Sequence, residues 1–184
     1  RAVTILATLA GLIWVVAEDF QSTFPQADRN LIVAIFIATT IATVRVSRVR
    51  GSAMTAPIHL AVAGIGFSLL AWLGGSVLLA QISAAVALAT TGFLLWNWPI
   101  FRFPPSAALV IGAAVPLAAV AGALTISGAV SGAALAILVL IFFSDWLAGA
   151  ISLGGGRLAL ATRPILVAAV GMLAVAGAAA LATL

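Results

Sequence analysis

The sequence predicts an all-α fold, a polytopic transmembrane helical bundle of about seven spans that contains a duplicated helical hairpin. The first observation behind this prediction is the composition. Of 184 residues, 65% are hydrophobic and 7% are charged, and the mean hydropathy is +1.33. Such a chain has too few polar side chains to cover a soluble globule, so lipid must solvate most of its surface.

The second observation is a series of continuous apolar runs rich in Ala, Leu, Val and Ile. In lipid, helices satisfy every backbone group inside such a run, whereas the strands of a membrane barrel alternate in polarity over about ten residues. The runs form a single transmembrane domain, 1–184. Its predicted parts are the first two spans (1–50), hairpin repeat one (57–98), hairpin repeat two (105–146) and the final span (164–184).

The third observation is that the hairpin occurs twice at a constant offset. Each copy has an apolar run, a small-residue turn and a second apolar run that ends in a polar residue followed by Trp. Pro, Gly and Trp are scarce enough for their coincidence to favour a duplication. The matching pairs are Pro57/Pro105, Val62/Val110, Gly64/Gly112, Leu69/Leu117, Ala71/Ala119, Gly74/Gly122, Ser83/Ser131, Ala85/Ala133 and Trp98/Trp146.

Each span is placed between the residues that stop its apolar run. Glu18 and Asp19 stop the first run. The second run is short for a hydrocarbon core of roughly 30 Å, so its end must lie near the headgroups. Turns are predicted at Gly74–Ser76 and Thr125–Gly128, and Pro164 begins the final span. The predicted helices are 2–17, 31–44, 58–73, 77–98, 106–124, 129–150 and 164–184, with a loop at 151–163.

The arginines test this segmentation. When the spans alternate in direction, Glu18, Asp19, Asp28 and Arg29 collect on one face and all other basic residues on the opposite face. The positive-inside rule predicts such an asymmetry for a correct count. We therefore expect an integral protein of the bacterial inner (plasma) membrane, with a cytoplasmic amino terminus and the carboxy terminus of this segment on the outer side. The cytoplasmic set is Arg1, Arg45, Arg48, Arg50, Arg102, Arg157 and Arg163.

Small residues four positions apart are expected to pack the helices. Gly64 and Ser68 have this spacing, as do Gly128 and Gly132. The spacing lets two helix backbones approach closely in lipid, so packing is the favoured interpretation over a ligand role.

Asp145 is the most informative polar residue, because it lies several residues inside the predicted sixth span. An isolated carboxylate at such depth costs about 2.5–3.5 kcal/mol, so it is usually paired, protonated or in contact with water. It belongs either to a proton or substrate pathway or to a structural pair with a loop arginine. Asn97 holds the same place in the first hairpin, and we expect the two to face each other across a pseudo-symmetric interface.

His59, the only histidine, begins the third predicted span. Two interpretations stay open for it, a proton-linked role with Asp145 and an interfacial side chain that reaches water. Trp96, Trp98 and Trp146 lie where the cytoplasmic aromatic belt is expected.

A cytoplasmic basic mouth is predicted from Arg45, Arg48 and Arg50. Arg102 lies in the loop between the hairpins and joins the candidate substrate or proton pathway. These arginines either draw organic anions or anionic headgroups, or only set the topology.

Several classes of function are excluded by what the sequence lacks. Without cysteine there are no disulfides and no thiolate metal sites, and a single histidine without a carboxylate at helical spacing predicts no metal site. No catalytic constellation is found, so we expect neither an enzyme nor a cofactor. The stretches between spans are too short for a nucleic-acid-binding domain, so the net charge of +4 indicates topology.

Two family resemblances follow from these features. The Arg-led first span, the second span that ends in Arg and the two hairpins resemble the membrane half of the fusaric acid resistance and aromatic acid exporter superfamily. That resemblance implies efflux of small aromatic or organic acids and carries over no functional residue. Locally, Phe103-Pro104-Pro105-Ser106-Ala107-Ala108 is similar to the signature of the HPP family of small membrane proteins, with Phe103 in place of its His. Some members of that family are linked to nitrite transport.

The sequence thus leads to two hypotheses. The first is a membrane transporter that exports a small organic or aromatic anion, and the second is a non-catalytic membrane subunit or scaffold that docks a partner protein. The expected partners are the lipid bilayer, a small organic anion and a second copy or second membrane half, with no nucleic acid.

Overall fold

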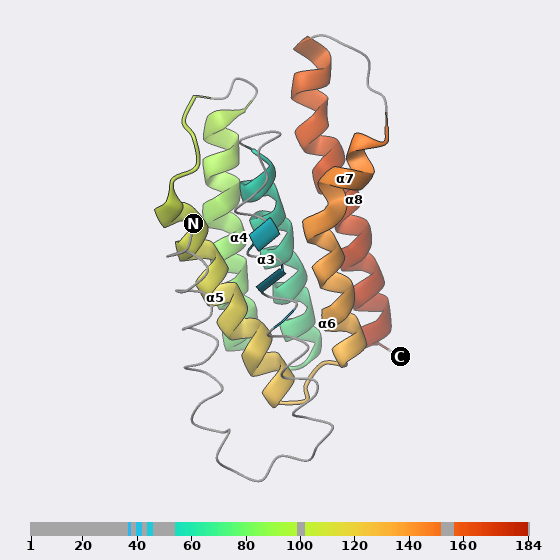
Figure 1. Cartoon of the computed structure of the whole chain (residues 1–184). Helices are drawn as coiled ribbons and strands as arrows, with labels where there is room; N and C mark the ends of the chain where they lie inside the picture. The colour runs from blue at the N-terminus through green and yellow to red at the C-terminus, as the bar shows by residue number, and fades with distance from the viewer. Residues whose placement is uncertain are drawn as a thin grey trace.

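The computed structural model describes residues 37, 40, 41, 44, 45, 54–98, 102–151 and 157–183, with side chains from 161 onward in the last range. Ile37, Thr40, Ile41, Val44 and Arg45 are helical. Throughout these ranges the chain forms helices joined by short turns, and no strand occurs within them. The protein is therefore all-helical where the structure describes it (Figure 1).

Within the described part of the chain, five spans have the length and composition to cross a membrane. They correspond to the five predicted between 58 and 184, which confirms a membrane-type helical bundle. The first two predicted spans, 2–17 and 31–44, lie outside the described residues except for the few helical positions near Arg45. The helices are α3 (Thr55–Leu73), α4 (Val77–Asn97), α5 (Ala107–Ile126), α6 (Gly132–Val139), the 3₁₀ turn η1 (Leu140–Phe143), α7 (Ser144–Gly149) and α8 (Arg157–Ala182).

The turn between α3 and α4 is formed as predicted. The amide of Ser76 donates to the carbonyl of Ala71, and the amide of Gly75 donates to the carbonyl of Trp72, which is the Schellman pattern. Gly75 has a φ of +78°, a left-handed conformation that glycine adopts without steric cost. This turn reverses the chain and lays α4 against α3.

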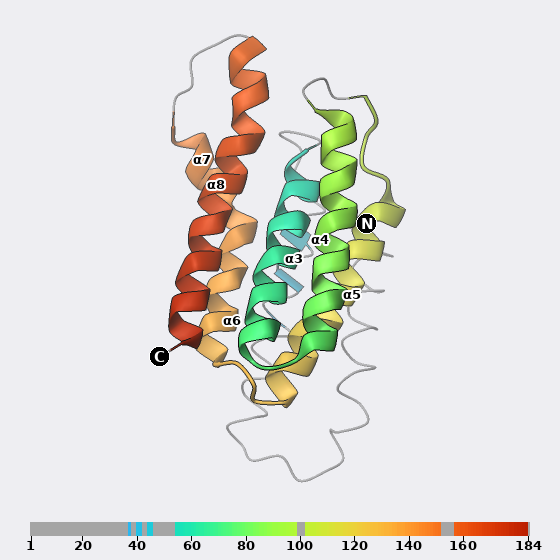
Figure 2. The same ribbon diagram turned by 180° about the vertical axis from the view of Figure 1, so that it is seen from behind.

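The centre of the bundle is α3, whose first half is almost wholly buried. One side of it is covered by α4 and α5, and the other chiefly by α8, with smaller contributions from η1 and α6 (Figures 1 and 2). Side chains fill the space between α3, α6 and α8. A Cβ atom added to Gly66 would lie 2.8 Å from Cδ2 of Leu138 and 3.2 Å from Cγ2 of Val175.

The two predicted hairpins differ in packing. The first closes, with α3 along α4, but α6 packs chiefly on α8 and α5 packs on α3 and α4. The expectation that the second pair forms an equivalent closed hairpin is therefore wrong, because each of its helices buries its apolar face on a different neighbour. The sequence duplication itself stays a prediction.

Several element boundaries also differ from the sequence prediction, and α3 begins at Thr55 instead of residue 58. The sixth span begins at Gly132, three residues late, because the hydroxyl of Ser131 accepts the amide of Ala134 at 3.3 Å and caps the helix there. It is interrupted by η1, which the sequence did not predict. The final helix begins at Arg157, so the predicted loop at 151–163 is helical from Arg157 onward and Pro164 lies inside α8. A proline removes only one backbone donor, and the residues before it are good helix formers.

Candidate functional site

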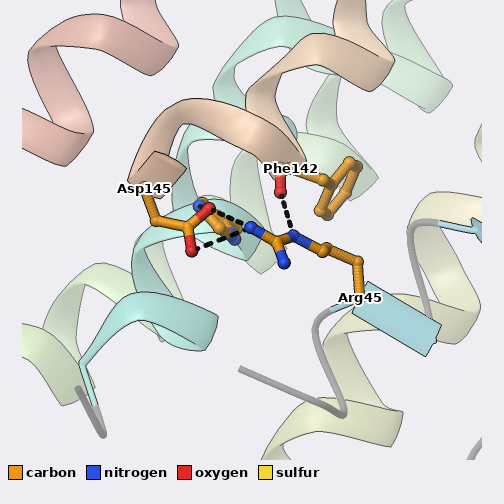
Figure 3. A network of polar contacts seen from close by, with 4 residues as sticks. Arg45, Phe142 and Asp145 are labelled. Carbon is orange, nitrogen blue, oxygen red and sulfur yellow. Dashed lines mark hydrogen bonds and ion pairs between the residues drawn. The ribbon is translucent and has the colours of Figure 1, made fainter. Parts of the chain in front are cut away.

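The polar centre of the described bundle is an ion pair between Arg45 and Asp145 (Figure 3). Nη2 of Arg45 lies 3.1 Å from Oδ1 and 3.2 Å from Oδ2 of Asp145. The side chains are 35% and 21% exposed, respectively. One nitrogen therefore donates to both carboxylate oxygens, and the pair is partly buried.

The 3₁₀ turn η1 positions the rest of this contact. It places the carbonyl of Phe142 where Nε of Arg45 donates to it at 3.4 Å (Figure 3). Cζ of Arg45 also lies 5.6 Å from the ring centroid of Phe143, a cation–π distance. Three groups at the junction of η1 and α7 thus hold one guanidinium, and Nη1 has no partner among the described residues.

His59 lies on the other side of Asp145. Its Nε2 is 3.8 Å from Oδ1 of Asp145, and its ring meets the Phe142 ring edge-on, with 5.9 Å between the centroids. The side chain is 0% exposed, so the interpretation that it reaches water at the interface is wrong: α3 is covered on all sides at this level. Neither ring nitrogen has a hydrogen-bond partner in the described part of the chain.

Two buried hydroxyls share this lack of partners. The Oγ atoms of Ser144 and Ser83 accept and donate no hydrogen bond within the described ranges. Ser144 faces α8, where a Cβ atom on Gly171 would lie 3.7 Å from its Oγ and 3.1 Å from Cγ1 of Val62. The glycine therefore lets α8 approach α3 next to the polar cluster, which consists of Arg45, His59 and Asp145.

Asn97 makes its hydrogen bonds outside this polar cluster. Its side-chain oxygen accepts the amides of Arg102 and Phe103 at 3.2 and 2.8 Å, and its amide nitrogen donates to the carbonyl of Phe93 at 3.0 Å. The buried side chain thus stabilises the loop that follows α4. These hydrogen bonds are all local, and the face-to-face arrangement of Asn97 and Asp145 stays a prediction.

Arg102, the remaining predicted site residue that the structure describes, lies at the same end of the bundle. This is the end at which α4 stops, α5 starts, α7 stops and α8 starts (Figure 1). Arg102 is exposed in the loop before α5, and the guanidinium of Arg163 lies next to Gly149. Arg48 and Arg50 of the predicted basic mouth lie outside the described residues. Which side of the membrane this end faces stays a prediction.

The three tryptophans predicted for the aromatic belt are all exposed. Trp96 and Trp146 are the most exposed, and the indole of Trp98 donates to the carbonyl of Ala161 in α8 at 3.5 Å. Trp98 therefore also links the end of α4 to α8.

Sequence reasoning identified Asp145 and His59 and offered a loop arginine as one partner for the carboxylate, but it did not single out Arg45. Arg45 was assigned to the basic mouth, and one hundred positions separate it from Asp145. A usable signal was the depth of the two residues in the membrane. The second and sixth predicted spans end at the same membrane face, so Arg45 and Asp145 are expected at a similar depth. Nothing in the sequence indicated the carbonyl of Phe142, which lies in the unpredicted 3₁₀ turn.

Chemically, the cluster combines an anion-binding guanidinium, a carboxylate and an imidazole with two open nitrogens. Among the described residues, no three His, Asp or Glu side chains come close enough to hold a metal ion. Comparisons with protein-family models, with curated proteins and with solved structures found no match.

Proposed function

We propose that this chain is a membrane transport protein for a small organic anion and that Arg45 binds the anion. The observation that carries the proposal is the Arg45–Asp145 pair inside a membrane-type bundle. Ionisable groups at such positions are costly and typically mark ion or substrate pathways. The carboxylate of Asp145 occupies the position on Arg45 that the carboxylate of a substrate would take.

The geometry of the guanidinium favours exchange with a ligand. A tight Arg–carboxylate pair uses two parallel N–H donors, whereas Asp145 takes one nitrogen. Nη1 has no partner among the described residues and can take a second carboxylate oxygen, and about a third of the side chain is accessible. An organic carboxylate that accepts hydrogen bonds from both Nη1 and Nη2 forms the two parallel bonds that Asp145 does not form.

The local backbone also supports movement at this point. The sixth span changes from α-helix to 3₁₀ turn and back within a few residues of Asp145. Such interruptions often mark hinges, and transporters place their sites at discontinuous helices. The basic end of the bundle and the resemblance to aromatic acid exporters point to an anionic substrate.

Uptake of p-aminohippurate, an aromatic monocarboxylate of low passive permeability, into proteoliposomes tests the proposal. The wild-type protein should accelerate uptake over empty vesicles, and Arg45→Gln and Asp145→Ala should each reduce it at least tenfold. Arg163→Gln is the matched control, because it removes an exposed charge at the same end and should leave uptake unchanged. Equal uptake by Arg45→Gln and wild type would refute the assignment.

The scaffold function remains the second candidate, and the filled interior favours it. Apolar side chains such as Leu138 and Val175 occupy the space between α3, α6 and α8. The test is purification in mild detergent from the native membrane. A constant, stoichiometric partner together with wild-type flux equal to empty vesicles would select this function over transport.

A further inference from the structure

The charges of the cluster impose a condition on anion binding. Arg45 and Asp145 together form a neutral unit as long as they are paired. An anion that takes Arg45 displaces the Asp145 carboxylate, which is 21% exposed and then has no cation among its described contacts. A sheltered charge without a partner is strongly unfavourable, so the displaced carboxylate must be neutralised.

A group that receives the displaced carboxylate is already in place. Nε2 of His59 lies 3.8 Å from Oδ1 of Asp145 and has no hydrogen-bond partner among the residues that the structure describes. Once Arg45 releases Asp145, a movement of about 1 Å brings these two atoms to hydrogen-bond distance. A protonated carboxyl group donates to the neutral imidazole there, and the contact satisfies one of the two buried ring nitrogens.

We propose that binding of an organic carboxylate to Arg45 is coupled to uptake of one proton by the Asp145–His59 pair. The proposal rests on the transport function above and names its coupling ion. The balance is one anion and one proton: the anion replaces Asp145 on Arg45, and the proton neutralises Asp145 against Nε2 of His59. The occupied site then has the same net charge as the empty one, so the anion crosses the membrane without adding charge to the protein.

The groups that face Asp145 allow this assignment. From the helix before α3 the facing charge is Arg45, and from α3 it is His59. On α8 the described charged side chain is Arg163, which lies next to Gly149, four residues beyond Asp145 in the chain. A carboxyl group or imidazole is therefore required to carry the proton, and Asp145 and His59 are the described groups at hand.

Isothermal titration of p-aminohippurate into the purified protein in phosphate and in Tris measures the proton count directly. Proton uptake makes the observed enthalpy differ between the two buffers by the difference of their ionisation enthalpies. We expect one proton per bound anion in the wild type. Binding with the same enthalpy in both buffers would overturn the inference and leave the proposed function intact. Absence of both binding and flux would instead overturn the proposed function.

Two variants separate the roles within the pair. Asp145→Asn imitates the neutral carboxyl group, so it should bind the anion without proton uptake. His59→Gln should keep the proton but weaken binding by about tenfold, because the protonated carboxyl group loses its acceptor. Arg163→Gln should match the wild type in both quantities. A proton still taken up by Asp145→Asn would contradict the assignment, provided that the variant elutes as a single species on gel filtration.

A second measurement does not depend on flux or heat. Because His59 is the only histidine, selective ¹⁵N labelling of histidine gives one set of ring signals. Addition of p-aminohippurate should shift these signals in the wild type and not in Arg45→Gln. Unchanged ring signals in the wild type at saturating ligand would also overturn the inference.

Discussion

Gly64 in α3 and Ala87 in α4 lie so close that a Cβ atom added to Gly64 would be 3.0 Å from both Cβ and the backbone nitrogen of Ala87. The carbonyl oxygen of Ser83 would lie at the same distance. Two of these three atoms are backbone, and they cannot move without shifting α4. The close approach expected from the small-residue spacing around Gly64 is thus present, and it fixes the distance between the two central helices.

Gly64→Ala should therefore destabilise the protein, by about 1–3 kcal/mol, as overpacking in a well-packed core does. Gly92→Ala is the matched control, because Gly92 also lies in a helix but an added Cβ meets nothing within 4 Å. There alanine should stabilise by up to about 1 kcal/mol. Thermal unfolding in detergent, followed by circular dichroism, measures both. A melting temperature for Gly64→Ala at or above that of Gly92→Ala would contradict the close packing.

Asn97→Ala should release the loop between α4 and α5. The loop amides of Arg102 and Phe103 lose their acceptor, and each lost hydrogen bond costs about 1 kcal/mol. Hydrogen exchange read by mass spectrometry should become faster in the peptide that contains these two residues. Asn97→Asp keeps the acceptor and should retain most of the protection from exchange. Equal exchange in Asn97→Ala and wild type would show that Asn97 does not stabilise the loop.

The Arg45–Asp145 pair should show a coupling energy in a double-mutant cycle. Arg45→Met and Asp145→Leu should each destabilise the fold, because each leaves one sheltered charge without its partner. The double variant should be less destabilised than the two single effects add up to, with a coupling of roughly 0.5–3 kcal/mol. Chemical unfolding in a detergent–denaturant series provides the values. Strict additivity would mean that the contact contributes nothing to folding.

Cysteine labelling can test the predicted orientation, since the chain contains no cysteine of its own. Phe103 and Ser127 are exposed at opposite ends of α5. If the basic end is cytoplasmic, a membrane-impermeant maleimide added to intact spheroplasts should label Ser127→Cys, and should label Phe103→Cys only after permeabilisation. The reverse pattern would place the arginine-rich end outside.

Much of the fold could be predicted because lipid imposes a simple condition on the sequence. Every backbone group in the hydrocarbon core must be bonded within its own segment, so each long apolar run becomes a helix. The α3–α4 turn could also be predicted, because Gly75 supplies the residue in the left-handed conformation that a Schellman turn requires. The start of α8 is harder to predict. A proline usually marks a helix boundary, but the good helix formers before Pro164 let the helix begin at Arg157.

The candidate site was predictable in its members but not in its contacts. The depth of Asp145 in an apolar run indicated that it needs a partner, and the scarcity of other ionisable groups reduced the candidates to a few. Its choice of Arg45 depends on which helices become neighbours, and that is decided by close contacts such as the one at Gly171. The same tertiary packing buried His59, which sequence position alone placed at the interface.

The separate packing of α5 and α6 has a consequence for biogenesis. A chain that enters the bilayer as the ribosome delivers it can pack α4 and α5 on α3 early, while α8, which is the main partner of α6 and covers the other side of α3, is still to be synthesised. Until that last helix arrives, Leu135 and Leu138 face lipid or the insertion machinery. The final segment is thus the step that closes half of the molecule, and a ribosome stalled before it would leave an inserted but half-assembled protein as a target for membrane quality control.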